Sequence, residues 1–147
     1  MPPIKRSLGI DQCHFAMRKA ARQISRFYDA HLERSGIRIT QFLTLAALNE
    51  LGSAAVIALA ERLDIERTAM GKMVEFLQRD GLVTIKPSPT DGRSRLIELT
   101  EKGGRLHKKA APLWEKAQRQ FKQLNGAKRV IELRRGLAEM TVDDVTS

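Results

Sequence analysis

The sequence predicts a mainly α-helical fold, an α+β winged helix with about six helices and a wing of two or three β-strands. Apolar residues recur at spacings of three and four over most of the 147 positions, which is the period of amphipathic helices. Two short helical patterns lie back to back between Val56 and Arg79, separated by a turn of a few residues. Two strand-like runs joined by a basic, turn-rich loop follow between Leu82 and Leu99. A helix, a turn, a helix and a basic hairpin in this order make a winged helix.

The composition narrows the class of protein. The length fits a single domain, and 26 basic against 17 acidic residues give a net charge of +9, which modestly favours a polyanionic partner. A single cysteine excludes an internal disulfide and fits a reducing cytosol. No apolar run approaches the roughly 20 residues of a membrane span, and the first residues lack the apolar segment of a secretory signal. We therefore expect a cytoplasmic protein with no membrane partner.

The N-terminal segment predicts an arm followed by a long helix. Residues 1–10 are rich in Pro and Gly, and we interpret them as a solvated tail, although Lys5-Arg6 could contact phosphate. An amphipathic helix is expected over residues 11–32, with Asp11 as its N-cap. Its apolar stripe comprises Phe15, Ala16, Ala20, Ile24, Phe27, Tyr28 and Leu32.

Three shorter helices are expected next. Thr40 is the predicted N-cap of a helix over residues 41–51, which Gly52-Ser53 ends. Helical spacing resumes over residues 56–63 and is broken by Asp64-Ile65-Glu66. The following helix ends at Asp80-Gly81, because glycine readily takes the left-handed conformation found at helix ends.

The C-terminal half predicts the hairpin and two further helices. Strands are expected over residues 82–85 and 95–99. Thr100 is the expected N-cap of a helix that runs to about residue 124, with a kink or a break caused by Pro112. A last helix is expected over residues 127–140, before a tail that contains Asp143-Asp144.

The motifs of the helix-turn-helix and the wing resemble those of the MarR family of bacterial transcription regulators. The similar segments are Leu59-Ala60-Glu61-Arg62-Leu63, Glu66-Arg67-Thr68, Arg79-Asp80-Gly81-Leu82-Val83, Asp91-Gly92-Arg93-Ser94-Arg95 and Leu99-Thr100-Glu101-Lys102-Gly103. The resemblance covers the chain from about Cys13 to about Leu137. It implies a DNA-binding regulator, most often a repressor, and not an enzyme. No phosphate-cradling loop or nucleophile motif suggests catalysis.

The resemblance also implies a homodimer held together by the N- and C-terminal helices. Residues 1–34 and 105–147 would form the dimerisation segments, and residues 35–104 the DNA-binding domain. A twofold dimer places two recognition helices about one turn of double-stranded DNA apart, which predicts a pseudo-palindromic operator. The apolar surface of the flanking helices fits this interpretation, because a self-complementary interface buries faces that a monomer leaves exposed.

The wing carries the first of the predicted DNA contacts. Arg93 resembles the arginine that the family inserts into the minor groove, where a narrow groove attracts a guanidinium group. Asp91, followed by Gly92, is expected to hold the loop in shape by pairing with Arg95 or Arg93. Arg95 is expected either to contact phosphate or to make only that pair.

The second helix of the helix-turn-helix carries the other predicted contacts. Arg67 and Thr68 lie in its first turn, where a helix that enters the major groove meets base edges. Lys72 and Arg79 are expected at phosphates. Ala69 is expected either to contact a thymine methyl group or to act as a spacer. For these polar residues the alternative is a helix face that only contacts solvent. For the whole protein the alternative is nonspecific DNA binding, because phosphate contacts supply affinity in both specific and nonspecific complexes.

Ligand and redox chemistry provide two further hypotheses. In the family a small aromatic or phenolic effector commonly binds between the dimer helices and the DNA-binding lobe, and the pocket residues carried over are Cys13, His14, Met17, Phe42 and Trp114. Core packing is the alternative for each. One branch of the family senses peroxides through a cysteine near the start of the first helix, usually beside tyrosines. Because Tyr28 lies about four turns beyond Cys13, we expect a buried, inert thiol. No metal-ligand spacing or cofactor motif is found.

Overall fold

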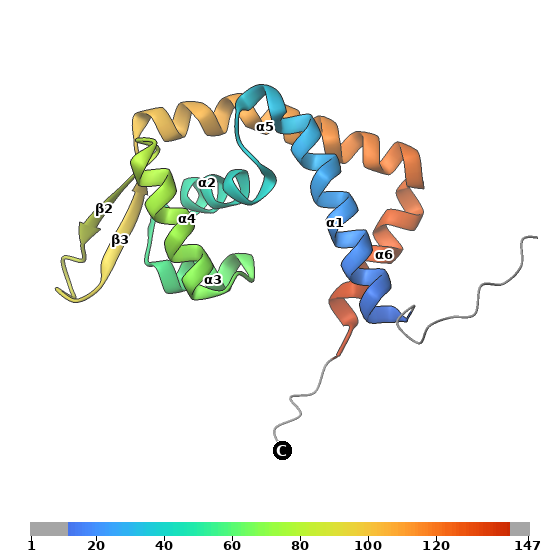
Figure 1. The fold of residues 1–147 in the computed structure, drawn as a ribbon, viewed down its shortest axis with the longest axis horizontal. Coiled ribbons are helices and arrows are strands. Elements are labelled where there is room, and N and C mark those ends of the chain that lie inside the picture. Colours follow the sequence, from blue (N-terminus) through green and yellow to red (C-terminus); the bar gives the residue numbers. More distant parts are fainter. Residues whose placement is uncertain (1–11, 142–147) are drawn as a thin grey trace, which may run out of the picture.

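The computed structural model describes residues 12–141 and is built from a winged-helix lobe and a group of long helices (Figure 1). The elements are α1 (Cys13–Leu32), the 3-10 helix η1 (Glu33–Ser35), α2 (Ile39–Leu51), β1 (Ser53–Ala54), α3 (Val56–Leu63), α4 (Arg67–Arg79), β2 (Val83–Pro87), β3 (Arg95–Leu99), α5 (Glu101–Asn125) and α6 (Ala127–Glu139). The predicted N-cap Asp11, the N-terminal arm and the acidic tail lie outside the described residues. The predicted mainly α-helical winged helix is confirmed.

Helix α5 links the two parts of the molecule. Figure 1 shows α5 starting beside the strands and α4, and ending beside α1 and α6. It therefore runs without interruption across the expected boundary between residues 104 and 105.

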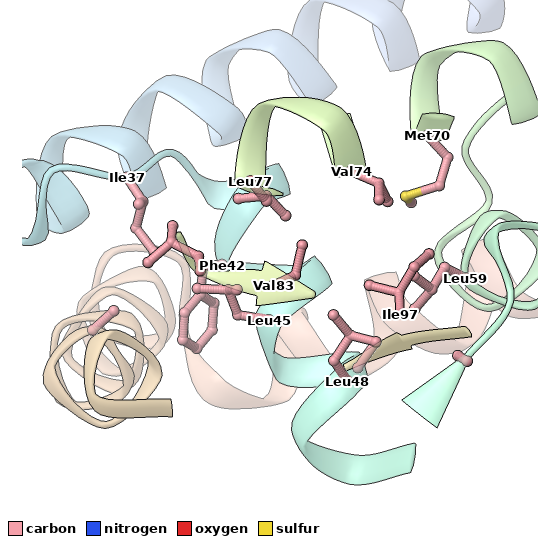
Figure 2. Close-up of a cluster of buried hydrophobic side chains, with 14 of the residues drawn as sticks. Ile37, Phe42, Leu45, Leu48, Leu59, Met70, Val74, Leu77, Val83 and Ile97 are labelled. Atoms are coloured by element: carbon pink, nitrogen blue, oxygen red, sulfur yellow. The ribbon is translucent and has the colours of Figure 1, made fainter. Parts of the chain in front are cut away.

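The core of the lobe is formed where α2, α3, α4 and the sheet meet (Figure 2). Leu45, Leu59, Met70, Leu77 and Ile97 are all fully buried there. They come from three helices and one strand that the sequence predicts separately. Burial of large apolar side chains is the main favourable contribution to folding, and here it fixes the position of α4 on the lobe.

The sheet has three antiparallel strands in the order β1-β3-β2. In the hairpin, Val83 pairs with Leu99 and Pro87 with Arg95, so β2 begins and ends later than the predicted strand. The third strand, β1, pairs Ser53 with Glu98. Gly52 does end α2, with a φ of 81°, but Ser53 then joins the sheet instead of a loop.

Helix α2 starts at Ile39, earlier than predicted, and Thr40 is not its N-cap. The backbone N–H of Ile39 donates to Asp29 Oδ1 at 2.8 Å, and that of Arg38 donates to Gln41 Oε1 at 2.9 Å. These two side-chain oxygens satisfy amide groups at the start of the helix, which otherwise lack partners. A side chain of α1 therefore caps α2, and this decides where α2 begins.

Of the predicted kink or break at Pro112, the break is absent, because α5 continues as one helix through this residue. Proline removes one helical hydrogen bond and disfavours the preceding turn. Ala110 and Ala117, on either side of it, are fully buried, so both halves of the helix are held by packing. The predicted N-cap of α5 is confirmed, because Thr100 Oγ1 accepts a 3.0 Å hydrogen bond from the N–H of Gly103.

Helices α1 and α5 pack together near the end of α1. His31 Nε2 lies 2.6 Å from Gln120 Oε1, and the rings of Phe27 and Phe121 are 6.2 Å apart. Helix α6 buries only Val130 within the chain. The other large apolar residues at this end of the chain, namely Ile131, Leu133, Leu137 and Met140, are about half exposed.

Candidate nucleic-acid interface

One face of α4 is buried in the lobe, and the opposite face is open to solvent. Met70, Val74 and Leu77 are at most 2 % exposed, and their spacing places them on one side of the helix. The predicted contact residues Arg67, Thr68, Ala69, Lys72 and Arg79 are all exposed. The helical period places Thr68, Lys72 and Arg79 directly opposite the buried side, while Arg67 is open to solvent because it is the first residue of α4.

The turn between α3 and α4 has a sharp, left-handed conformation. Asp64 has a φ of 52°, the only positive φ of a non-glycine residue in the part of the chain described. Aspartate tolerates this conformation better than most residues, because its short polar side chain can bond locally. The N–H of Ile65 then donates to the Ala60 carbonyl at 2.9 Å. This hydrogen bond closes the end of α3, and the chain continues into α4. The predicted break at this point is confirmed.

The loop between β2 and β3 is closed by a local network of hydrogen bonds. The backbone N–H of Ser88 donates to the Ser94 carbonyl at 2.8 Å, and the N–H of Ser94 donates to the Asp91 carbonyl at 3.0 Å. The hydroxyl of Ser88 also accepts from the N–H groups of Thr90 and Asp91, each at 3.3 Å. These bonds give an exposed loop a defined shape.

Asp91 shapes the loop through the backbone of Arg93, one of its two predicted partners, and through the hydroxyl of Ser94. Its Oδ1 accepts from the backbone N–H of Arg93 at 3.1 Å, and its Oδ2 accepts from the Ser94 hydroxyl at 2.9 Å. Both bonds favour the carboxylate and lower the pKa of Asp91, the Arg93 N–H having the larger effect. The predicted pairing with Arg93 is therefore made by its backbone N–H and not by its guanidinium group, because donors two and three residues ahead lie within reach of this short side chain.

The two wing arginines are left open to solvent by this arrangement. Arg93 and Arg95 are exposed, and among residues 12–141 neither guanidinium group makes an ion pair. The ion pair that the hairpin does contain joins Lys86 Nζ to Glu98 Oε2 at 3.3 Å. Gly92 has no neighbour within 4 Å of where a side chain would begin, so steric crowding does not explain its presence in the loop.

The lobe carries no net charge, although the chain is strongly basic. Between residues 37 and 104 nine basic side chains balance nine acidic ones. The net charge of +9 therefore resides entirely in the segments before and after the lobe. Screening by salt limits the range of interactions between surface charges to about 8 Å under physiological conditions. Binding of DNA by the lobe therefore depends on where its individual basic side chains lie, and its net charge contributes little.

The residues predicted to line an effector pocket fall into two separate groups. Phe42 is buried, and its ring centroid lies 5.6 Å from those of His107 and Trp114. Burial lowers the pKa of His107. Cys13, His14 and Met17 are exposed on the first turns of α1, about 20 Å or more along that helix from the lobe. One chain therefore does not bring the two groups together.

Cys13 is exposed at the first position of α1, and the expectation of a buried thiol is wrong for the single chain. Nothing among the described residues buries the first turns of α1. Within residues 12–141 no three His, Cys, Asp or Glu side chains gather in a way that could hold a metal ion. None of the helices described there is both long and apolar enough to cross a membrane.

Comparisons with known proteins decide the family. The MarR family model matches residues 37–94. The organic hydroperoxide resistance transcriptional regulator of Bacillus subtilis (strain 168) is 31% identical over 103 residues, which are 70% of each chain. The chain belongs to the MarR family. It is a transcriptional regulator with relatives that include a repressor of Pseudomonas putida, NicR, which is 28% identical over 65% of this chain and 61% of that protein.

Solved structures of MarR-family proteins share the fold of this regulator. The transcriptional regulator MosR of M. tuberculosis, crystallised in complex with DNA, is 36% identical with a TM-score of 0.78, and the match covers 87% of this chain and 92% of that one. A MarR variant from E. coli in complex with operator DNA has a TM-score of 0.82 over 89% of this chain and 94% of that one. At 20% identity the second likeness shows the fold alone.

Sequence reasoning missed several contacts that organise the interface of this regulator. Lys102 Nζ donates to the Asp80 carbonyl at the end of α4, over a separation of 22 residues. Ser88 and Ser94 complete the wing loop, whereas the sequence assigns a positioning role there only to Asp91 and Gly92. Ser88 stands three residues before Asp91 within a turn, and this spacing is a local signal that could have indicated the positioning role of Ser88. No local signal could have placed Lys102 beside Asp80.

Proposed function

We propose that this MarR-family regulator is a homodimeric repressor that binds a pseudo-palindromic operator. The observation that carries the proposal is the open face of α4 together with Arg93, which has no ion-pair partner among the described residues, on the wing of the same lobe. Two such surfaces related by a twofold axis recognise two half-sites about one turn of double-stranded DNA apart. The DNA complex of the 36% identical regulator MosR supports this function.

In the proposed complex α4 enters the major groove. Arg67 and Thr68 reach base edges, Ala69 contacts a thymine methyl group, and Lys72 and Arg79 bind phosphates. Each is exposed, and the rigid packing of the opposite face of α4 in the lobe core holds the set in place.

The wing supplies the minor-groove contact. Arg93 enters the groove, because no acidic partner within residues 12–141 holds its guanidinium group. Asp91 orients Arg93 through a hydrogen bond from the backbone N–H of that residue. Gly92 adds no side chain to the tip of the loop. Arg95, at the start of β3, binds a flanking phosphate.

The proposed dimer is held by α1, α5 and α6. The half-exposed apolar side chains at the C-terminal end support it, because a single chain leaves Ile131, Leu133, Leu137 and Met140 in water. Phe15 and Met17 on α1 are exposed to a similar degree. A self-complementary interface built from these faces buries apolar area that the monomer cannot.

Release from DNA is proposed to follow binding of a small aromatic effector. The relative BpsR of Bordetella bronchiseptica, described as regulated in its DNA binding by 6-hydroxynicotinic acid, is 23% identical and motivates this class of ligand. Phe42 of α2 and Trp114 of α5 place their ring centroids 5.6 Å apart where the lobe meets α5. The effector weakens DNA binding only by as much as it prefers the conformation that does not bind.

A thiol switch is the second candidate for release. Cys13 is exposed, and the 31% identical relative is named for organic hydroperoxide resistance. In this alternative a peroxide oxidises the thiol to a sulfenic acid, and the dimer leaves its operator. A Cys13→Ser variant that still releases DNA on peroxide treatment eliminates this candidate.

Binding to the DNA upstream of its own gene tests the proposed function. The purified protein is titrated on this duplex at fixed salt, with random duplex DNA as competitor. A specific regulator prefers its site by at least about 1000-fold. Equal displacement by random DNA refutes a specific operator in this region and favours nonspecific binding.

A further inference from the structure

The chain that leaves α4 is bonded to the first turn of α5 through three consecutive carbonyl groups. Lys102 Nζ donates to the Asp80 carbonyl at 2.8 Å, Thr100 Oγ1 donates to the Gly81 carbonyl at 2.6 Å, and the N–H of Thr100 donates to the Leu82 carbonyl at 3.0 Å. We call this set, Asp80–Leu82 with Thr100 and Lys102, the α4–α5 junction. The residues that its two side-chain bonds join are 19 and 22 positions apart in the sequence.

The Thr100 hydroxyl serves both sides of the junction at once. It donates to Gly81 and accepts from the N–H of Gly103 at 3.0 Å. One hydroxyl group therefore caps α5 and holds the end of α4, and its single hydrogen is committed to Gly81. Valine at this position would keep the shape of the side chain and lose both bonds, whereas serine would keep both.

The charge of Lys102 fits the partner it meets. The carbonyl groups at the C-terminal end of a helix carry the negative end of the helix dipole. Gly81, with a φ of 74°, follows α4 in the left-handed conformation, and the Asp80 carbonyl before it faces α5. An ammonium group is well suited to such a carbonyl, because hydrogen bonds with a charged donor are stronger than neutral ones.

Gly103 allows the two sides to approach closely. A methyl group at this position would overlap the Leu82 carbonyl oxygen and lie 3.0 Å from its carbon. It would also lie 3.3 Å from Leu99 Cδ2. A methyl group at Gly104, the next residue, would meet nothing within 4 Å. Backbone contact at Gly103 thus makes the junction a packed joint as well as a bonded one.

The hairpin leaves and re-enters the lobe at this same junction. Val83 and Leu99 are paired at the base of β2 and β3, directly next to Leu82 and Thr100. The junction therefore holds α4, the base of the wing and the start of α5 as one body. The 25 residues of α5 extend about 37 Å from it toward α1 and α6.

We propose that Thr100, Lys102 and Gly103 are positioning residues that fix the orientation of α4 relative to α5, so that α4 turns when α5 turns. The inference rests on the proposed function, because α5 ends in the dimerisation segment. In the dimer, the junction of each subunit transmits the geometry of the dimer helices to its recognition helix. It thereby sets the half-site spacing that the regulator accepts.

The test compares operator duplexes whose half-sites are moved apart or together by one base pair. Thr100→Val and Lys102→Met remove one side of the junction each, Thr100→Ser restores the hydroxyl, and Glu61→Gln is a control on the exposed face of α3. The wild type and both controls are expected to keep one preferred spacing. In Thr100→Val and Lys102→Met the preference falls by at least about 2- to 12-fold, the range of one hydrogen bond.

A second measurement reads the junction without DNA. Spin labels at Glu75→Cys, in a Cys13→Ser background, report the distance between the two recognition helices of the dimer. The distance distribution is expected to be narrow with Thr100 or Thr100→Ser and broader with Thr100→Val.

The outcomes separate the junction from the proposed function. Unchanged spacing preference and unchanged distance distributions in Thr100→Val and Lys102→Met overturn the inference, even when both variants are less stable, and leave the proposed function standing. A wild-type protein with no preferred spacing, or with no second label within range, refutes the palindromic operator or the dimer and, with it, the role of the junction.

Discussion

Replacing Gly103 by alanine, with Gly104→Ala as its matched control, probes the packing at the start of α5. Both substitutions add one methyl group to the same turn, and both gain up to about 1 kcal/mol of helix propensity over glycine. They differ in surroundings, because a methyl group at Gly103 would overlap the Leu82 carbonyl oxygen whereas one at Gly104 meets nothing within 4 Å.

The expected difference follows from those contacts. Overpacking a buried position costs about 1–3 kcal/mol. Displacing the Leu82 carbonyl also weakens its 3.0 Å hydrogen bond from the N–H of Thr100, which contributes about 1 kcal/mol. Because the propensity gain cancels in the comparison, Gly103→Ala should be less stable than Gly104→Ala by about 2–4 kcal/mol. For a chain of this size, this difference lowers Tm by about 4–16 °C.

Thermal and urea unfolding of the two variants measure this difference. Protein concentration is held equal in all samples, since association of subunits raises the apparent stability of the folded state. Gly104→Ala should unfold at or above the wild-type temperature. If the two alanine variants unfold together, the close approach of Gly103 to Leu82 does not constrain the fold, and the packing argument for the α4–α5 junction fails.

Four further outcomes are expected. Arg93→Ala should lower the slope of log K against log salt by about 1 and weaken operator binding in a gel-shift titration, while Arg34→Ala, which removes the same charge far from the wing, should do neither. Gly71→Ala should raise the free energy of unfolding by up to about 1 kcal/mol in urea titrations, because a methyl group there meets nothing within 4 Å; a loss of stability would show that the glycine is required. The folded-state pKa of Asp91 lies below its ordinary value of about 3.9, so the order that its carboxylate gives the wing is complete above that pH and is lost as pH falls through the lower folded-state pKa. Amide exchange at the wing should accordingly be slow at pH 5 and faster in Asp91→Ala, and equal rates would contradict this role. Burial lowers the pKa of His107 below about 6.5, so stability should decline as pH falls below that value, and His107→Phe should remove this decline in unfolding experiments at pH 5 and pH 7.

The local parts of the interface could be predicted from the sequence. The spacing of Met70, Val74 and Leu77 decides which side of α4 is buried, and the opposite side then carries Thr68 and Lys72. This inference needs no knowledge of the rest of the fold, because helical periodicity is a property of neighbouring residues.

The effector pocket shows where such reasoning stops. Phe42 and Trp114 do meet, whereas Cys13, His14 and Met17 lie on distant turns of α1. Their grouping rests on the family resemblance, and a single chain gives no contact between the two sets. The exposure of Cys13 has the same origin, since its burial depends on what packs over the start of α1.

The sequence by itself determined the helices, the hairpin, the open face of α4 and membership of a family of DNA-binding regulators, because these depend on periodicity, turn residues and motifs within short stretches. The tertiary structure alone decided that α5 continues through Pro112, that Asp29 caps α2, and that Lys102 meets the Asp80 carbonyl. Each of these depends on contacts between residues far apart in the chain or on packing around a helix. Local preference is overridden wherever burial and long-range hydrogen bonds contribute more free energy than a single residue's propensity.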